Sequence, residues 1–234
     1  MRRRKLIGDQ RGFTLIEVLV ALSIGSVVLF GVLNVFTVAI TKSAEVNDRI
    51  EALQRGRPAL DRITTLLDAQ VCIANNQPPI VAGATATDLT FYADLGNDDF
   101  SPTQFRLSYD AATRTLNETS WAGTSSGSSW TFPAAPTRSV PLLRDVAPPT
   151  TTGPIFRYFA YSSADPPTPD AEITALPLSA TDAARVVRVK ASIAAQPTRT
   201  KKTDDRSTII DGDGFVATAD PRDPLGGPRC SAGA

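Results

Sequence analysis

The hydrophobic residues of this chain follow two patterns, which divide its 234 residues into a helical first third and a strand-rich remainder. An apolar run opens at Phe13, and residues 18–40 carry no charge, a length of 23 residues that can span a bilayer as a helix. Beyond Thr41 the apolar residues recur at steps of three, four and seven among charged ones, as in an amphipathic helix. From Asp88 onward the period is two, which predicts β-strands.

The amphipathic stretch predicts that one helix continues from the apolar run to about Gln70. Its apolar stripe consists of Val46, Ile50, Leu53, Leu60, Ile63 and Leu67. Because the strands that follow need a partner to cover them, we expect this stripe to pack on a sheet, although a free coiled-coil stalk has the same pattern. Pro58 lacks a backbone donor and is expected to kink the helix after Gly56.

The second pattern predicts several antiparallel strands. Alternation or apolar clustering marks six candidate segments, at residues 88–95, 105–109, 114–121, 140–146, 155–162 and 184–193. The segments 105–109 and 114–121, with a turn at 110–113, are expected to form an antiparallel hairpin. The segment 123–129 is rich in Gly, Ser and Thr and is expected to be a loop. The polar tail 198–234 is expected to be mostly irregular, with one strand near 207–210. One helix followed by antiparallel strands predicts an α+β fold in which a long N-terminal helix packs on an antiparallel β-sheet.

The formal net charge is zero, but it is unevenly distributed. The first 12 residues contain five basic residues and one acid, Asp9, and the rest of the chain has 19 basic and 23 acidic residues. A positive leader before an apolar helix predicts a cytoplasmic N-terminus and an extracytoplasmic C-terminal domain. Because the exported part is mildly acidic, nucleic acid is not an expected partner.

One acid, Glu17, lies inside the apolar run, four residues after the Gly12–Phe13 junction. An acid at mid-bilayer costs roughly 2.5–3.5 kcal/mol and is usually retained because it has a partner or a function. Cleavage between Gly12 and Phe13 would create an α-ammonium about one helical turn from Glu17. The two charges could then pair within one subunit or between neighbouring subunits.

Residues 12–22 resemble the class III signal of type IV pilins and type II secretion pseudopilins, with Gly12, Phe13 and Glu17 in the key positions. The resemblance implies a pilin-like fold, cleavage after Gly12 and N-methylation of Phe13 by a prepilin peptidase. It also implies that Glu17 guides the subunit into a filament. The implied partners are other pilin or pseudopilin subunits, the inner-membrane assembly platform and membrane lipid, and no cofactor is expected.

The resemblance suggests a division of the chain into four parts. Residues 1–12 would be a cytoplasmic leader, 13–41 the transmembrane and filament-core helix, 42–70 its amphipathic continuation, and 71–234 a β-rich extracytoplasmic domain. Cleavage after residue 12 leaves 222 of the 234 residues. This length and the Arg-rich helix before Cys72 resemble the minor subunits of the J or W type. Type II secretion, a type IV pilus and DNA uptake remain open as the filament system.

Two other interpretations of the N-terminus are possible. The first is a signal anchor with a stray acid, which would hold an extracellular binding domain that never polymerises. The second is a cleaved secretory signal with its cleavage site near residues 37–39. A signal h-region has 7–15 residues, however, and the apolar run is longer.

The two cysteines, Cys72 and Cys230, both lie in the exported part. An even number of cysteines in an oxidising compartment favours a disulfide, and two buried free thiols are the alternative. A zinc site is not expected, since the chain has no histidine and no Cys-x-x-Cys motif.

The sequence offers little that could carry catalysis. It has no histidine, no G-x-S-x-G motif and no Gly-rich phosphate loop with Lys, so we expect a protein that is not an enzyme. The acidic segments 97–99 and 211–214 are candidate calcium loops. The second fails the EF-hand pattern, because Phe215 occupies the fifth position and no Glu follows. A solvated turn is the favoured interpretation of 211–214, and no metal site is predicted.

Overall fold

The protein is an α+β molecule with one long helix followed by antiparallel sheets, as predicted. The computed structural model describes residues 13–73, 77–96, 100–127, 129–150, 153–163, 167–197 and 208–215. Gly12, Cys230 and the acidic segment 97–99 lie outside these residues. The chain divides into two compact units, with the boundary between Asn47 and Asp48.

Helix α1 (Leu15–Asp68) runs without interruption through Pro58 and contributes to both units. In the second unit, one face of the helix is buried, at Ala52, Gly56, Ala59, Leu60, Ile63, Leu66 and Leu67. Val46 and Ile50, the first two members of the predicted apolar stripe, are instead 55% and 45% exposed. The predicted stripe identifies the correct face of the helix, but the buried part of that face begins only at Ala52.

The first sheet has four antiparallel strands in the order β1-β2-β3-β6. Their bounds are Asp88–Ala93 (β1), Thr103–Asp110 (β2), Thr115–Ala122 (β3) and Arg138–Arg144 (β6). The strands β2 and β3 form the predicted hairpin, and the register between β3 and β6 shifts between Leu116 and Asn117. The inner face of β1 is buried, and its Phe91 stacks on Phe105 of β2 with ring centroids 5.9 Å apart.

The second sheet has five strands in the order β11-β10-β8-β9, with β7 paired to β10. Their bounds are Val146–Ala147 (β7), Phe156–Ala160 (β8), Ala171–Ile173 (β9), Arg188–Ala195 (β10) and Thr208–Phe215 (β11). A small hairpin, β4 (Thr124–Ser126) and β5 (Ser129–Thr131), occupies the segment predicted to be a loop. A short helix, α2 (Ala180–Arg185), precedes β10.

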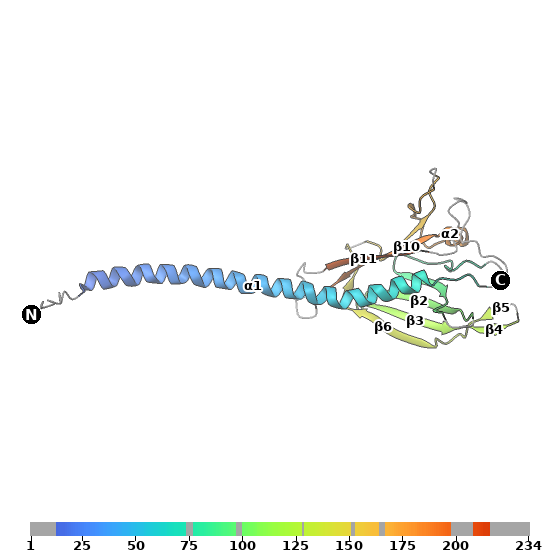
Figure 1. The fold of residues 1–234 in the computed structure, drawn as a ribbon, viewed down its shortest axis with the longest axis horizontal. Helices are drawn as coiled ribbons and strands as arrows, with labels where there is room; N and C mark the ends of the chain where they lie inside the picture. The colour runs from blue at the N-terminus through green and yellow to red at the C-terminus, as the bar shows by residue number, and fades with distance from the viewer. Residues whose placement is uncertain are drawn as a thin grey trace, which may run out of the picture. The chain divides into compact units, whose positions relative to one another are not determined.

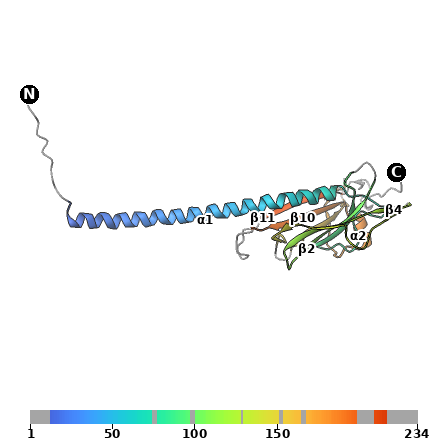
Figure 2. The same ribbon diagram turned by 90° about the horizontal axis from the view of Figure 1, so that it is seen from below.

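Strand β11 includes the segment 211–214, which is therefore part of a strand and not the solvated turn that we predicted. The reason is close packing on α1, which Figures 1 and 2 show running beside β11. A Cβ on Gly212 would lie 2.8 Å from the Thr64 side chain, and a Cβ on Gly214 would lie 2.1 Å from that of Leu67. Glycine at these two positions lets the strand backbone approach the helix.

Replacing Gly214 with alanine is expected to lower the free energy of unfolding of the domain by about 1–3 kcal/mol, because the new methyl group overpacks against Leu67. Asp213→Ala, one position earlier on the exposed face of β11, is the matched control and should change it by less than about 0.5 kcal/mol. Thermal or urea unfolding of the two variants measures the difference. Equal stability of the two variants would show that β11 does not pack tightly on α1.

Helix α1 is also tied to the first sheet by an ion pair. The Arg62 guanidinium donates from Nε and Nη2 to the two carboxylate oxygens of Glu118 on β3, at 3.0 and 2.9 Å. These hydrogen bonds raise the pKa of Arg62 above its ordinary value. The Glu118 side chain is only 4% exposed, so the Arg62 guanidinium is the counter-charge that the described residues provide for it. Bidentate pairing therefore sets both the position and the rotation of α1 on the sheet.

Candidate assembly site at the helix N-terminus

The first turn of α1 is closed by Thr14 and Glu17. The carbonyl of Thr14 accepts hydrogen bonds from the backbone N–H groups of Glu17 (3.1 Å) and Val18 (3.2 Å), which makes Thr14 the N-cap residue. The Thr14 hydroxyl accepts from the Glu17 N–H at 3.3 Å and lies 3.5 Å from Glu17 Oε2. Thr-x-x-Glu is the sequence pattern of a capping box. Sequence analysis missed this role, although the pattern was present at residues 14–17.

The negative charge of Glu17 is partly compensated by the dipole of its own helix, because Glu17 lies in the first turn. The N-terminal end of a helix is the positive end of its dipole, and a carboxylate in the first turn stabilises a helix by about 0.3–1 kcal/mol. Glu17 is nevertheless exposed, so its carboxylate can also accept hydrogen bonds from another chain.

Phe13 lies immediately before the cap and is 83% exposed. The structure thus places Phe13 and Glu17 at the same end of α1, as their spacing predicted. Gly12 lies outside the described residues, so the predicted cleavage junction itself is not tested by the structure.

Residues 13–44 are all exposed, including every large apolar side chain among them. Within the described part of the chain, α1 is the one helix that is long and apolar enough to cross a membrane. Its polar side chains donate to backbone carbonyls three or four residues earlier, at Ser23, Ser26, Asn34, Thr37 and Thr41. Internal satisfaction of polar groups is what a lipid environment requires. The helix therefore fits a single-pass membrane anchor.

Comparison with known families agrees with this geometry. Residues 7–33 match the family model described as the prokaryotic N-terminal methylation motif. No curated protein matches the chain. The matched segment contains Gly12, Phe13 and Glu17. The match covers the N-terminal segment alone, and together with the anchor and the α+β domain it supports a structural subunit related to type IV pilins and pseudopilins.

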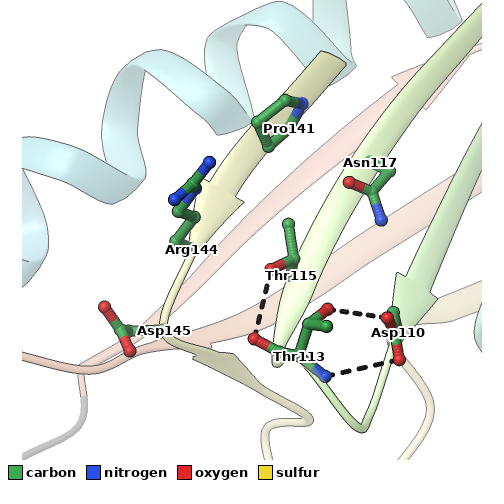
Figure 3. A pocket seen from close by; sticks show the side chains of 7 residues that line it. All are labelled: Asp110, Thr113, Thr115, Asn117, Pro141, Arg144 and Asp145. Carbon is green, nitrogen blue, oxygen red and sulfur yellow. Dashed lines mark hydrogen bonds between the residues drawn. The ribbon is translucent and has the colours of Figure 1, made fainter. Parts of the chain in front are cut away.

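A hollow of about 670 Å³ opens beside the turn between β2 and β3, and Figure 3 shows the side chains that line it. Those residues are Asp110, Thr113, Thr115, Asn117, Pro141, Arg144 and Asp145. The Asp110 carboxylate accepts from the Thr113 hydroxyl at 2.7 Å and from the Ala112 N–H at 2.9 Å, and these bonds lower the pKa of Asp110. Asp110 therefore stabilises its own turn, and we assign no chemistry to the hollow.

The cysteines and the acidic segment 211–214 were the other candidate site residues. Cys72 is disulfide-bonded, and Cys230 lies outside the described residues. In the segment 211–214, Asp211 lies 3.3 Å from the Lys190 ammonium. Among the residues that the structure describes, no group of three or more Cys, Asp or Glu side chains could hold a metal ion.

Proposed function

We propose that the chain is a minor pilin-like subunit, or pseudopilin, of a type II secretion or type IV pilus-type filament. A prepilin peptidase would cleave after Gly12 and methylate Phe13. The Glu17 carboxylate would then pair with the Phe13 ammonium of a neighbouring subunit. The observation that carries this proposal is the N-terminal methylation motif on an exposed apolar helix with an acid in its first turn.

The geometry of the first turn explains how Glu17 could serve both the free and the assembled subunit. The contact from the Thr14 hydroxyl to Glu17 is 3.5 Å long, whereas strong O–H···O bonds are about 2.5–3.0 Å. A charge-assisted bond from an ammonium is shorter and roughly twice as strong as a neutral one. In the free subunit the Glu17 carboxylate would contact the Thr14 hydroxyl. In the filament it would instead accept a hydrogen bond from the ammonium of a neighbouring Phe13.

The four-part division of the chain follows from this proposal. The leader, residues 1–12, would stay in the cytoplasm, residues 13–41 would lie first in the membrane and then in the filament core, and 42–70 would continue the helix to the extracytoplasmic domain, 71–234. Val46 and Ile50 are exposed apolar residues just beyond the anchor and are available for contacts with other subunits. We propose a minor subunit of the J or W type, which the Arg-rich helix before Cys72 resembles.

Cell fractionation tests the proposal against a signal-anchored binding domain. Cells that carry an assembly system are sheared, and the filament fraction is separated from the membranes and probed for the full chain. A filament subunit should appear in the sheared fraction together with the major subunit. A protein found only in membranes, in cells that do assemble the filament, would favour the non-polymerising anchor.

We further propose that Cys72 pairs with Cys230, the only other cysteine of the sequence. Mass spectrometry of a proteolytic digest made without reductant should find one peptide pair that joins the two residues and separates on reduction. The same digest of Cys230→Ser should lack this pair, and its Cys72 peptide should become alkylatable. Finding Cys72 joined to a second copy of the chain, or alkylatable in the unaltered protein, would contradict the pairing.

A further inference from the structure

Strand β11 is a long edge of the second sheet, and among the described residues no strand pairs with its outer side. A free edge presents unpaired N–H and C=O groups and is a template for another strand. The outer edges of β1, β6 and β9 are protected. Strand β1 is covered by hydrogen bonds from the segment that precedes it, such as Val81 N–H to Thr90 O at 2.9 Å. Strand β6 carries Pro141 and a register shift, and β9 has only three residues. Strand β11 has eight residues and contains no Pro, Lys or Arg. Apart from its pairing with β10, the described residues show one hydrogen bond to its backbone, from the Phe215 N–H to Asp68.

The direction of the free backbone groups follows from one hydrogen bond. The Phe215 N–H donates to Asp68 Oδ1 at 3.0 Å and therefore points away from β10. In an antiparallel strand the N–H and C=O of one residue point to the same side, and the side alternates along the strand. The N–H and C=O groups of Ile209, Asp211 and Asp213 thus point to the outer edge. Among the described residues, none forms a backbone hydrogen bond with them there.

The same residues expose their side chains. Ile209 is 53% and Phe215 49% exposed, and Asp211 and Asp213 lie between them on this face. Asp211 is paired with Lys190 at 3.3 Å. Asp213 lies opposite the same Lys190 in the register of β10 and β11, so one cation serves two acids on this face. The exposed face of β11 therefore carries, in order, an apolar residue, two acidic residues and a second apolar residue, at positions 209, 211, 213 and 215.

Strand β11 is also packed and paired within the subunit, without a partner protein. Its inner face is held against α1 by Gly212 and Gly214, and by the contact of Ile210 with Gly56, where a Cβ would lie 2.0 Å from Ile210 Cδ1. All eight residues of β11 are in register with β10. A pre-ordered strand loses little conformational entropy when another strand is added.

We propose that β11 is a docking edge to which an extended segment of another protein adds as a strand. The segment would carry a basic residue beside Asp213 and apolar residues beside Ile209 or Phe215, because cross-strand pairs of opposite charge and of apolar side chains are favourable. A second copy of β11 does not fit, since it would bring acidic residues together. This inference stands apart from the proposed filament function, because it does not depend on Gly12, Phe13 or Glu17.

Photo-crosslinking in the native membrane tests the proposal on the full chain. A benzophenone amino acid in place of Ile209 should crosslink to another protein, and peptide sequencing should place the crosslink in an extended segment with a basic residue. Asp211→Pro removes one outward N–H without removing a bond to β10, so it should reduce the crosslink at least tenfold. Asp211→Asn keeps the N–H and is the matched control.

Circular dichroism shows whether Asp211→Pro folds. If it does not fold, a second variant still tests the proposal. Asp213→Lys leaves the backbone intact and should reduce the crosslink several-fold through repulsion of the basic partner. The proposal is overturned if no other protein is crosslinked, if the crosslink joins residues 216–234 or β11 of a second copy, or if it is undiminished in the folded variants.

Discussion

Replacing Glu17 with alanine is expected to lower the amount of the chain in the sheared filament fraction at least tenfold, with membrane insertion unchanged or slightly improved. A hydrogen bond to a charged group contributes about 1.5–3 kcal/mol, and tenfold corresponds to about 1.4 kcal/mol. Loss of the carboxylate also leaves a neighbouring Phe13 ammonium without its counter-charge in a low-dielectric core, which adds to the penalty. Quantitative immunoblotting of the filament and membrane fractions gives the ratio.

Glu17→Gln is the informative companion to this variant. It keeps the size of the side chain and an acceptor oxygen near Thr14 but loses the charge. If pairing with an ammonium is what matters, Glu17→Gln should fail to assemble nearly as badly as Glu17→Ala. If the capping box alone matters, Glu17→Gln should assemble almost normally, since Gln also serves at that position of a capping box. Normal assembly of both variants would contradict any role of Glu17 in filament entry.

The second large effect is expected in the folded domain. Arg62→Ala should lower its free energy of unfolding by about 3 kcal/mol, because it leaves the Glu118 carboxylate, which is 4% exposed, without this counter-charge. This is the low end for a buried pair, since the Arg62 side chain is 34% exposed. Arg57→Ala, on the exposed face of the same helix, should change it by no more than about 0.5 kcal/mol. Urea unfolding monitored by circular dichroism at neutral pH measures both.

A double replacement shows whether the stability lost in Arg62→Ala comes from the unpaired charge of Glu118 or from lost packing. Arg62→Met combined with Glu118→Leu puts two apolar side chains where the ion pair was and should recover most of the stability, as replacing a buried pair often does. A loss for Arg62→Ala no greater than that for Arg57→Ala would mean that Glu118 is not held by Arg62 in solution.

The sequence predicted those elements in which burial and periodicity agree. The strand expected at 88–95 is β1 at Asp88–Ala93, where Leu89, Phe91 and Ala93 are buried as the alternation predicted. The hairpin expected at 105–121 is β2 and β3. The long helix was predicted to end near Gln70 and ends at Asp68. In each case the local pattern and the tertiary environment favour the same structure.

The elements that were missed depend on contacts distant in sequence. The hairpin of β4 and β5 has no apolar alternation, because β4 is exposed and β5 is at most half-buried. Strand β11 was expected to stop near residue 210, since Asp-Gly-Asp-Gly is typical of turns, but these glycines serve close packing on α1. Helix α2 occupies the start of the strand predicted at 184–193, and its signal, Ser179 as N-cap, was overlooked.

The candidate residues at the N-terminus were identified from a local pattern. Phe13 and Glu17 needed only helical spacing to be placed at one end of α1, whereas the role of Thr14 was missed. The exposed Val46 and Ile50 show the limit of such reasoning, because periodicity identifies the face of a helix and not what covers it.

The central claim is that the chain is a processed pilin-like subunit, and the mass of its N-terminal peptide tests it most directly. The protein is recovered from its native membrane and digested, and the N-terminal peptide is sequenced by mass spectrometry. We predict a peptide that begins at Phe13 and is heavier by one methyl group. An intact start at Met1 or Arg2 would contradict the claim and leave a signal-anchored domain, and a start near Ile40 would show a secreted protein in which Glu17 has no role.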